Sequence, residues 1–227
     1  MGKNKLERFR EISDYKEVLE LTDFQDEDVE KPRGRWQPDI FKNWNPIVLE
    51  LACGKGAYTL ELARRYPGKN FVGVDIKGAR IWKGARRARQ DGLENVRFLR
   101  IYIDHLEEYF AAGEVDDIWI TFPDPYLKGS DRDKRLTSPK FLSIYQKVLA
   151  AGGLVRLKTD SDKLFDFTRR VVQKTGCGVR EVVENIYRER PDDELLTIKT
   201  DYEKRHLENG RSILFISFEL PGEPIGS

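Results

Sequence analysis

The sequence has few of the residues that form disulfides or bind metal ions. Its 227 residues include two cysteines, Cys53 and Cys177, and two histidines, His105 and His206. Two cysteines do not make a disulfide framework or a thiolate metal cluster, and two isolated histidines do not complete a metal site. We therefore expect no metal ion in this protein.

Long apolar runs and a strong net charge are also lacking. No stretch approaches the ~20 apolar residues of a membrane span, and the polar segment 1–16 lacks the apolar core of a signal peptide. The 40 basic and 39 acidic residues nearly balance, so any nucleic-acid binding must depend on local patches. These absences predict a cytoplasmic protein, and the length suits one large domain.

From Pro46 onward, strand candidates alternate with helix candidates. Strands are expected at 47–53, 70–76, 95–101, 116–122 and 154–159, and helices at 57–66, 79–92, 138–150 and 161–175. This alternation predicts an α/β fold with a doubly wound, mostly parallel sheet. Two more strand candidates, 179–187 and 211–220, flank a polar loop and complete a seven-stranded sheet. They predict an antiparallel strand near one edge.

The first 38 residues are highly charged and are expected to form a flexible arm in front of the domain. Segment 6–21 has the pattern of a short amphipathic helix, and the Pro and Gly residues that follow end any helix. The domain itself is expected over residues 39–227.

The turn after the strand at 47–53 is rich in glycine, and an acid ends the next strand. Gly54 and Gly56 lie in "LACGKGAY", where a backbone without side chains can approach a ligand closely. Asp75 ends the strand at 70–76, where a carboxylate can accept both hydroxyls of a ribose. A helix-entry turn beside a solvated acid is a plainer interpretation. The order of the two features along the strands favours a site for an adenosine-containing cofactor.

Two further positions distinguish between classes of cofactor. A dinucleotide site needs a third glycine three residues after Gly56, where this chain has Thr59. Glu50 lies four residues before Gly54, and its carboxylate suits the cationic amino-acid end of S-adenosylmethionine better than a pyrophosphate. The residues therefore favour a methyltransferase over a nucleotide-dependent oxidoreductase.

Two acids follow later strands of the predicted sheet. Asp124 lies in "FPDPYLK", directly after strand 116–122, and Asp160 follows strand 154–159. Taken alone, Asp124 is explained as a turn residue between prolines, and Asp160 as a helix N-cap. Open α/β sheets bind ligands at the carboxyl ends of their strands. If the two strands are neighbours, both acids are expected in the site.

The motifs taken together resemble those of the bacterial tRNA (guanine-N7-)-methyltransferases. The resemblance covers almost the whole chain, and its most distinctive motifs are "GVDIKGARIWKGA", "FPDPYLK", "LKTD" and "TDYEKRHLENGRSILFISF". It implies a class I methyltransferase fold and S-adenosylmethionine as the methyl donor. It also implies that the acceptor is a guanosine in the variable loop of tRNA.

The resemblance also implies roles for individual residues. The matching cofactor positions are Glu50, Gly54, Asp75, Tyr102 and Asp124. Asp124 also matches the aspartate to which the family's catalysis is assigned. The matching substrate positions are Lys128, Asp160, Thr200, Asp201, Tyr202 and Glu203.

The chain departs from the family pattern in four places. Ala52 stands where glycine is usual, and residues 126–127 read Tyr-Leu in place of Trp-Pro. Tyr102 occupies a position that is often acidic, with Asp104 two residues later, so either residue is a candidate for the adenine-side contact. Loop 129–135 has fewer cations than the corresponding loop of relatives.

Positive charge is concentrated in two segments that are candidates for RNA binding. Segment 77–89 has six cations and no acid, and a solvated helix face explains it equally well. The loop after strand 116–122 is the better candidate, because cations close to the site can bind phosphates. Its cations are Lys128, Arg132, Lys134 and Arg135.

The N7 atom of guanine has a lone pair and no proton, so its methylation needs no general base. It needs N7 to be in line with the methyl group, and a carboxylate such as Asp124 can offset the charge that develops on guanine. Two alternatives stay open: a methyltransferase for exocyclic amino groups, because "PDPY" is similar to N/D-P-P-Y, and a non-catalytic RNA-binding relative. Only one proline separates Asp124 from the aromatic residue, which disfavours the first. The protein is expected as a monomer or a homodimer.

Overall fold

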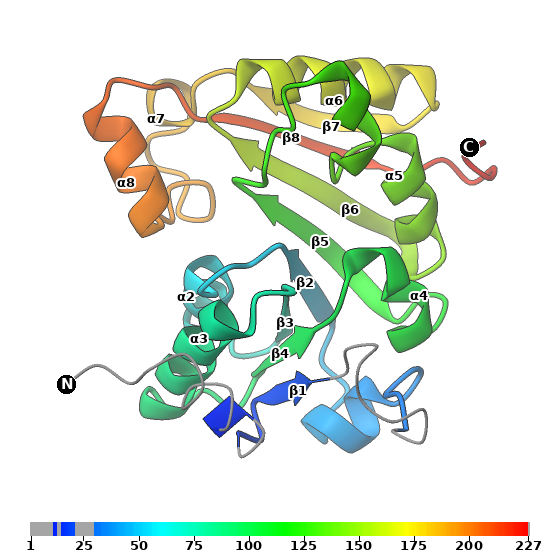
Figure 1. The fold of residues 1–227 in the computed structure, drawn as a ribbon, viewed down its shortest axis with the longest axis vertical. Coiled ribbons are helices and arrows are strands. Elements are labelled where there is room, and N and C mark those ends of the chain that lie inside the picture. The colour runs from blue at the N-terminus through cyan, green and yellow to red at the C-terminus, as the bar shows by residue number, and fades with distance from the viewer. Residues whose placement is uncertain (1–10, 13–14, 21–29, 227) are drawn as a thin grey trace.

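The computed structural model describes residues 11–12, 15–20 and 30–226, in which eight strands form one sheet (Figure 1). The strands are β1 (Val18–Glu20), β2 (Ile47–Leu51), β3 (Asn70–Val74), β4 (Val96–Arg100), β5 (Val115–Thr121), β6 (Leu149–Thr159), β7 (Gly178–Val183) and β8 (Leu214–Glu219). Their order across the sheet is β1-β4-β3-β2-β5-β6-β8-β7. The pairs from β1 to β6 are parallel, and β8 is antiparallel to both of its neighbours.

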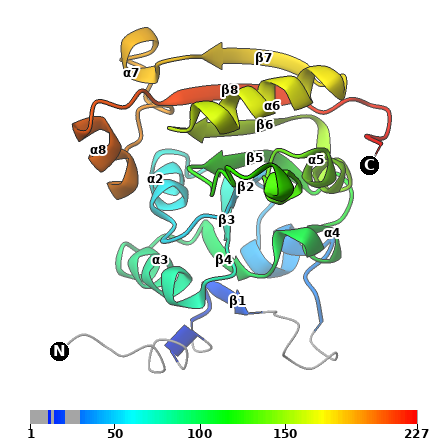
Figure 2. The same cartoon turned by 45° about the horizontal axis from the view of Figure 1, so that its top comes forward.

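Helices connect the strands and cover both faces of the sheet (Figure 2). They are α2 (Ala57–Arg65), α3 (Gly78–Gln90), α4 (Leu106–Tyr109), α5 (Pro139–Gln146), α6 (Asp162–Lys174), α7 (Ile186–Glu189) and α8 (Asp201–Glu208), with the shorter turns η1 (Trp36–Phe41), η2 (Ile103–His105) and η3 (Gly129–Lys134). The start of α6 illustrates why they form. The Ser161 hydroxyl accepts a hydrogen bond from the Leu164 N–H at 3.3 Å and so caps the helix.

The fold expected from the sequence is confirmed, with two additions. The seven predicted strands are present as β2 to β8, and the single antiparallel strand, β8, lies next to the edge. The eighth strand, β1, is only three residues long and extends the other edge by pairing with β4. The polar loop expected between the last two strands contains the short helices α7 and α8.

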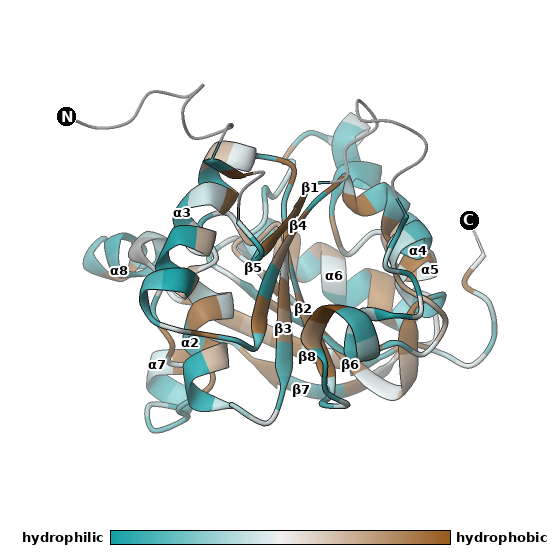
Figure 3. Ribbon diagram, turned by 90° about the horizontal axis from the view of Figure 1, so that it is seen from below, coloured by the Kyte–Doolittle hydropathy of each residue, from teal (hydrophilic) through white to brown (hydrophobic). Residues whose placement is uncertain are grey.

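Side chains alternate between the two faces along each strand, and both faces are buried because other segments pack on each of them. In β2, Ile47, Leu49 and Leu51 pack into a core that includes residues of η1, α4, α5 and α6. Val48 packs into the opposite core, with residues of α2, α3 and segment 186–198. In Figure 3 the central strands are mainly brown, and α8 at the periphery is mainly teal.

The predicted amino-terminal arm is described only in part. The helix expected at 6–21 lies mostly outside the described residues, and over Val18–Glu20 that expectation is wrong, because this segment forms β1. Further on, Trp36 is fully buried, stacks on Phe110 at 4.8 Å between ring centroids and donates to the Tyr109 carbonyl at 2.8 Å. The arm is therefore attached to the domain at both of these points.

The described residues contain neither a helix that could span a membrane nor a cluster of metal-ligating side chains. None of their helices is long and apolar enough to cross a bilayer. Within residues 11–12, 15–20 and 30–226, no three His, Cys, Asp or Glu side chains gather as metal ligands would.

Candidate active site

The turn between β2 and α2 bends through three residues with left-handed backbone. Ala52, Gly54 and Gly56 have φ angles of 56°, 59° and 65°. The Gly54 N–H donates to Oδ2 of Asp75 at 2.9 Å, and Oδ1 of Asp75 accepts from the Lys77 N–H at 2.8 Å. The structure thus brings the predicted turn and the predicted acid together, with the carboxylate held by main-chain donors.

Three glycines make room for one aromatic ring beneath this turn. A β-carbon at Gly56, Gly73 or Gly84 would lie less than 3.0 Å from the ring of Phe98. Real β-carbons do not approach a ring so closely, so any of these substitutions requires the ring to move. The glycines therefore serve packing, and Gly56 also serves its left-handed φ.

Glu50 is buried under the same turn and is surrounded by hydrogen-bond donors. Its Oε2 accepts from the Thr59 N–H at 2.8 Å and from the Thr59 hydroxyl, and its Oε1 accepts from the Thr121 hydroxyl at 2.6 Å. Burial raises the pKa of Glu50 to about 6, against the hydrogen bonds from Thr121 and Thr59, which lower it. Glu50 is therefore mainly a carboxylate at neutral pH.

Two adjoining cavities lie at the carboxyl ends of the parallel strands. The first, which we call the strand-end cavity, has a volume of about 440 Å³ and reaches from Asp75 to Asp124. The second, the turn cavity, has a volume of about 260 Å³, lies over the glycine turn and reaches Glu50. The two share Ala52, Arg80 and Phe122 in their walls. A larger cavity of about 750 Å³, near Gly153, contains no predicted site residue.

Both candidates for the adenine-side contact line the strand-end cavity. The Tyr102 side chain is exposed, whereas the Asp104 carboxylate is ion-paired with Lys140. Because Asp104 already has a cationic partner, the geometry favours Tyr102 for a new contact.

Asp124 is presented to the strand-end cavity by a strained turn. The residues around it, Phe122 and Tyr126, have left-handed φ angles of 48° and 42°, which are uncommon for residues with side chains. The Phe122 N–H donates to the Lys158 carbonyl at 2.8 Å and extends the pairing of β5 with β6. Asp124 itself is exposed on the cavity wall.

A third cavity lies on the other side of the Asp124 turn. This proline cavity, of about 490 Å³, is lined by Pro123, Pro125, Asp160 and Tyr202, among others. It shares Pro123 with the strand-end cavity and Tyr202 with the turn cavity. The Asp124 turn and Tyr202 therefore separate two spaces, one beside the glycine turn and one beside Asp160.

Asp160 lies at the end of β6, which neighbours β5, as the sequence predicted for adjacent strands. Its Oδ2 is 2.8 Å from Nη1 of Arg211 and 3.0 Å from Nδ1 of His206. The helix cap considered for it belongs instead to Ser161. Asp160 is therefore oriented by side chains from the segment before β8, and one of its faces borders the proline cavity.

The "TDYE" segment places its residues in different environments. Thr200 caps α8 by accepting from the Glu203 N–H at 3.1 Å, and it also lines the turn cavity. Tyr202 is 42% exposed, and its ring lies 5.3 Å from that of Phe122 and 4.1 Å from that of His206. Asp201 begins the helix. Glu203, the fourth predicted residue, does not border any of the three cavities at the site.

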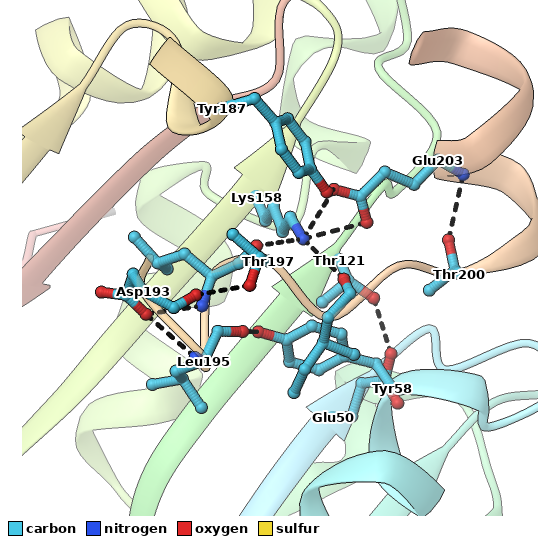
Figure 4. A network of polar contacts seen from close by, with 12 residues as sticks. Glu50, Tyr58, Thr121, Lys158, Tyr187, Asp193, Leu195, Thr197, Thr200 and Glu203 are labelled. Carbon is cyan, nitrogen blue, oxygen red and sulfur yellow. Dashed lines mark hydrogen bonds and ion pairs between the residues drawn. The ribbon is translucent and has the colours of Figure 1, made fainter. Parts of the chain in front are cut away.

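Glu203 instead forms a buried ion pair with Lys158 (Figure 4). Both side chains are fully buried, with 2.7 Å between Nζ of Lys158 and Oε1 of Glu203. The Tyr187 hydroxyl also donates to Oε1 at 2.7 Å. Lys158 donates further to the carbonyls of Leu196 and Ile198, at 2.6 and 2.9 Å. These contacts attach segment 196–203 to β6.

The helix α2 contacts Leu195, the residue just before this segment. The Tyr58 hydroxyl donates to the Leu195 carbonyl at 2.8 Å, as Figure 4 shows. Lys158, Tyr58 and Tyr187 were not predicted as part of the site. The one signal in the sequence was the lysine in "LVRLKT", since a lysine inside a buried strand requires a partner.

The predicted RNA-binding cations do not all face the same way. Lys128, Arg132 and Lys134 are exposed, and Lys134 pairs with Asp131 at 2.9 Å. Arg135 is buried with 8% exposure, and its guanidinium donates to main-chain carbonyls. Its position is that of an internal hydrogen-bond donor.

Several cations of segment 77–89 are also engaged with other side chains. Arg87 pairs with Asp91 at 2.9 Å, and Arg86 lies over the ring of Trp82 at 5.4 Å. Arg80 differs from them, because it lies in the wall shared by the strand-end and turn cavities.

Comparison with known proteins shows the family of the chain. Residues 44–216 match the family model described as "Putative methyltransferase". The chain is 46% identical over 224 residues to a tRNA (guanine-N(7)-)-methyltransferase of Bacteroides fragilis, covering 98% of this chain and 88% of the relative. It is 51% identical over 193 residues to one of Porphyromonas gingivalis, covering 85% and 78%. The chain belongs to the tRNA (guanine-N(7)-)-methyltransferase family.

Solved structures of methyltransferases have the same fold as this family member. The 16S rRNA methyltransferase KamB superposes with a TM-score of 0.61 at 16% identity, over 78% of this chain and 89% of that one. At this identity the likeness concerns the fold alone. For this tRNA (guanine-N(7)-)-methyltransferase family member, the class I methyltransferase architecture expected from the sequence is confirmed.

Proposed function

We propose that this chain transfers a methyl group from S-adenosylmethionine to N7 of a guanosine in tRNA, at position 46 of the variable loop. The observation that carries the proposal is the Asp124 turn. On one side, it borders the cavity that contains Asp75, and on the other side, it borders the cavity that contains Asp160. A donor and an acceptor in these two spaces would meet at Asp124 and Tyr202.

The residues of the first two cavities fit S-adenosylmethionine. Asp75 is suited to ribose hydroxyls, and the Glu50 carboxylate to a cationic amino group. Lys55 and Arg80 line the turn cavity and can pair with the carboxylate of the amino-acid end. When bound, S-adenosylmethionine supplies an electrophilic methyl group on its sulfonium. Tyr102 and the wall at Ile101 suit the adenine ring.

Guanine fits the proline cavity, beside Pro123, Pro125 and Tyr202. Tyr202 offers an exposed aromatic face on which an unstacked base can lie. Asp160 borders this space and is an acceptor suited to N–H groups of the guanine edge. The geometry thus supports the predicted substrate role for Asp160 and Tyr202, and it supports Thr200 as a residue between donor and acceptor.

For methylation of N7, the protein has to position the guanine against the methyl group and to compensate the charge that develops on guanine. Because N7 carries no proton, no side chain has to remove one, and the rate depends on alignment of N7 with the methyl group. Positive charge moves onto guanine as the bond forms. The Asp124 carboxylate stabilises that charge, and it can accept a hydrogen bond from the guanine edge as well.

The exposed cations of loop 128–134, Lys128, Arg132 and Lys134, are the proposed contacts for tRNA phosphates. They follow the Asp124 turn in the chain, and Lys134 also lines the strand-end cavity. Phosphate contacts of this kind make RNA affinity dependent on salt. We place the protein in the cytoplasm because its proposed acceptor is tRNA, and both a monomer and a homodimer fit the proposal.

The proposal is tested by incubating unmodified tRNA with methyl-labelled S-adenosylmethionine and analysing the nucleosides. Label is expected in N7-methylguanosine, and a transcript with adenosine at position 46 is expected to take up none. Label in N6-methyladenosine or N2-methylguanosine would instead identify an exocyclic amino acceptor. Stoichiometric tRNA binding without turnover would indicate a non-catalytic relative.

A further inference from the structure

The turn that carries Asp124 has few hydrogen-bond donors of its own. Pro123 and Pro125 lack an N–H. Among the described residues, no hydrogen bond between two main-chain atoms joins residues 123–127 to the rest of the chain. A turn of this kind is not held by regular structure, so its conformation depends on side chains from elsewhere.

Arg135 donates to two carbonyls of this turn that accept no main-chain hydrogen bond. Its Nε lies 3.1 Å from the Pro125 carbonyl oxygen and 3.2 Å from that of Tyr126, and its Nη2 lies 2.8 Å from the Tyr126 oxygen. These two residues follow Asp124 directly. The planar guanidinium therefore fixes two successive carbonyls with one rigid group, which a lysine ammonium cannot reproduce.

The guanidinium is itself held in place. It lies over the ring of Phe167, 4.3 Å from the centroid, and only 8% of Arg135 is exposed. No carboxylate of the described residues forms an ion pair with it. The segment after it is anchored to α6 by a 2.6 Å hydrogen bond between the hydroxyls of Thr137 and Thr168.

We infer that Arg135 is a positioning residue, which acts through the carbonyls of Pro125 and Tyr126 to hold Asp124 at the meeting point of the cavities. This replaces the sequence-based prediction that Arg135 binds RNA phosphates. The two roles differ in what they change, because a positioning residue affects the rate of methyl transfer and a phosphate ligand affects tRNA affinity. The effect of Arg135 on the rate of methyl transfer rests on the proposed function.

The first experiment compares Arg135→Lys with the wild type in steady-state methylation of tRNA. A displaced Asp124 should lower kcat by about a hundredfold, the scale of a misplacement near 1 Å, while the KM for tRNA and its salt dependence stay unchanged. Arg169→Lys is the matched control, because this arginine lies over Phe165 on the outer part of α6 at 5.9 Å and pairs with Glu184. Its kcat should stay at the wild-type value.

A second measurement does not depend on activity. Hydrogen exchange followed by mass spectrometry should show faster exchange of the amides of 124–128 in Arg135→Lys than in the wild type, and no change there in Arg169→Lys. If the wild type methylates no tRNA, the proposed function fails, and the exchange result still decides whether Arg135 holds the turn.

The remaining outcomes are equally decisive. In Arg135→Ala, which removes the charge, a normal kcat with a raised KM for tRNA and a salt slope shallower by about 0.7 would identify Arg135 as a phosphate ligand and overturn the inference. Normal exchange at 124–128 would overturn it too. If Arg135→Lys folds poorly, Arg135→Ala is assayed with added guanidinium, which should restore kcat by refilling the site. Absence of rescue in a folded Arg135→Ala would count against positioning.

Discussion

The two sides of the site are held together by different interactions. On the side proposed to bind the methyl donor, called the donor side here, residues 50–56 and Asp75, the acids accept hydrogen bonds from main-chain N–H groups and hydroxyls. On the side proposed to bind the methyl acceptor, called the acceptor side here, residues 123–127, 158–160 and 200–206, charged side chains make the contacts. The donor side is therefore part of the sheet itself, whereas the acceptor side depends on a few buried or half-buried charges.

The largest expected effect is on stability, from breaking the buried pair of the acceptor side. Lys158→Met leaves the Glu203 carboxylate buried without its cation, which should lower the free energy of unfolding by about 3–5 kcal/mol. Urea denaturation measures the loss. The double variant Lys158→Met/Glu203→Leu should recover much of it, since no unpaired charge then remains. Equal stability of single and double variants would contradict this account of the acceptor side.

The next effect is on catalysis, at the boundary of the two sides. Asp124→Asn keeps the shape of the side chain and removes its charge, so kcat should fall by about 100-fold to 1,000-fold. Binding of S-adenosylhomocysteine, measured by calorimetry, should change by less than about tenfold, or 1.4 kcal/mol. Asp166→Asn on the exposed part of α6 serves as the control. Unaltered turnover in Asp124→Asn would remove the role proposed for this carboxylate.

On the donor side, Glu50 should make the free energy of unfolding depend on pH. Burial raises the pKa of Glu50 from 4.5 to about 6, so the folded state holds this proton more tightly than the unfolded state. Below pH 4.5, the proton on Glu50 contributes its full share to the free energy of unfolding. This contribution, about 2 kcal/mol, is lost as pH rises through 6. Glutamine does not titrate, so Glu50→Gln should not show this loss. The free energy of unfolding of the variant minus that of the wild type should therefore rise by about 2 kcal/mol from pH 4.5 to pH 7. A parallel pH profile in urea denaturation would show that Glu50 is not perturbed.

The smallest effect concerns the left-handed Ala52 of the donor side. Its φ of 56° is unfavourable for a residue with a β-carbon, so Ala52→Gly should raise the free energy of unfolding by about 1 kcal/mol. In thermal unfolding, this corresponds to a Tm higher by roughly 2–4 °C. Ala57→Gly, in the first turn of α2, should lower stability instead. A lower Tm for Ala52→Gly would mean that the turn is not strained.

The donor side was largely predictable from the sequence, because its pattern is local. Gly54 and Asp75 end successive strands, and parallel strands bring such ends together. The acceptor side was predictable only in part. Asp124 and Asp160 follow from strand order, but the partner of Glu203 lies 45 residues earlier, at the second-last position of β6.

Arg135 shows why the remainder could not be predicted. A cation in a polar loop beside other cations is normally solvated, so its charge indicated RNA. Its surroundings depend on two carbonyls that accept no main-chain hydrogen bond and on a ring presented by α6. Neither is visible in the spacing of residues, because both arise from how the loop folds back on the sheet.

The position of β8 has a consequence for how the protein is made. Within the described chain, β7 pairs with β8 alone, and β8 is synthesised about thirty residues later. Until then, β6 presents an unpaired edge to its surroundings, which is a known route to misassociation. A ribosome-bound chain can pair β2, β3 and β5 early. The proline cavity, lined in part by Arg211 and Ser212, is completed only with the last part of the chain, and the same holds for the wall of the turn cavity that Thr200 and Tyr202 form.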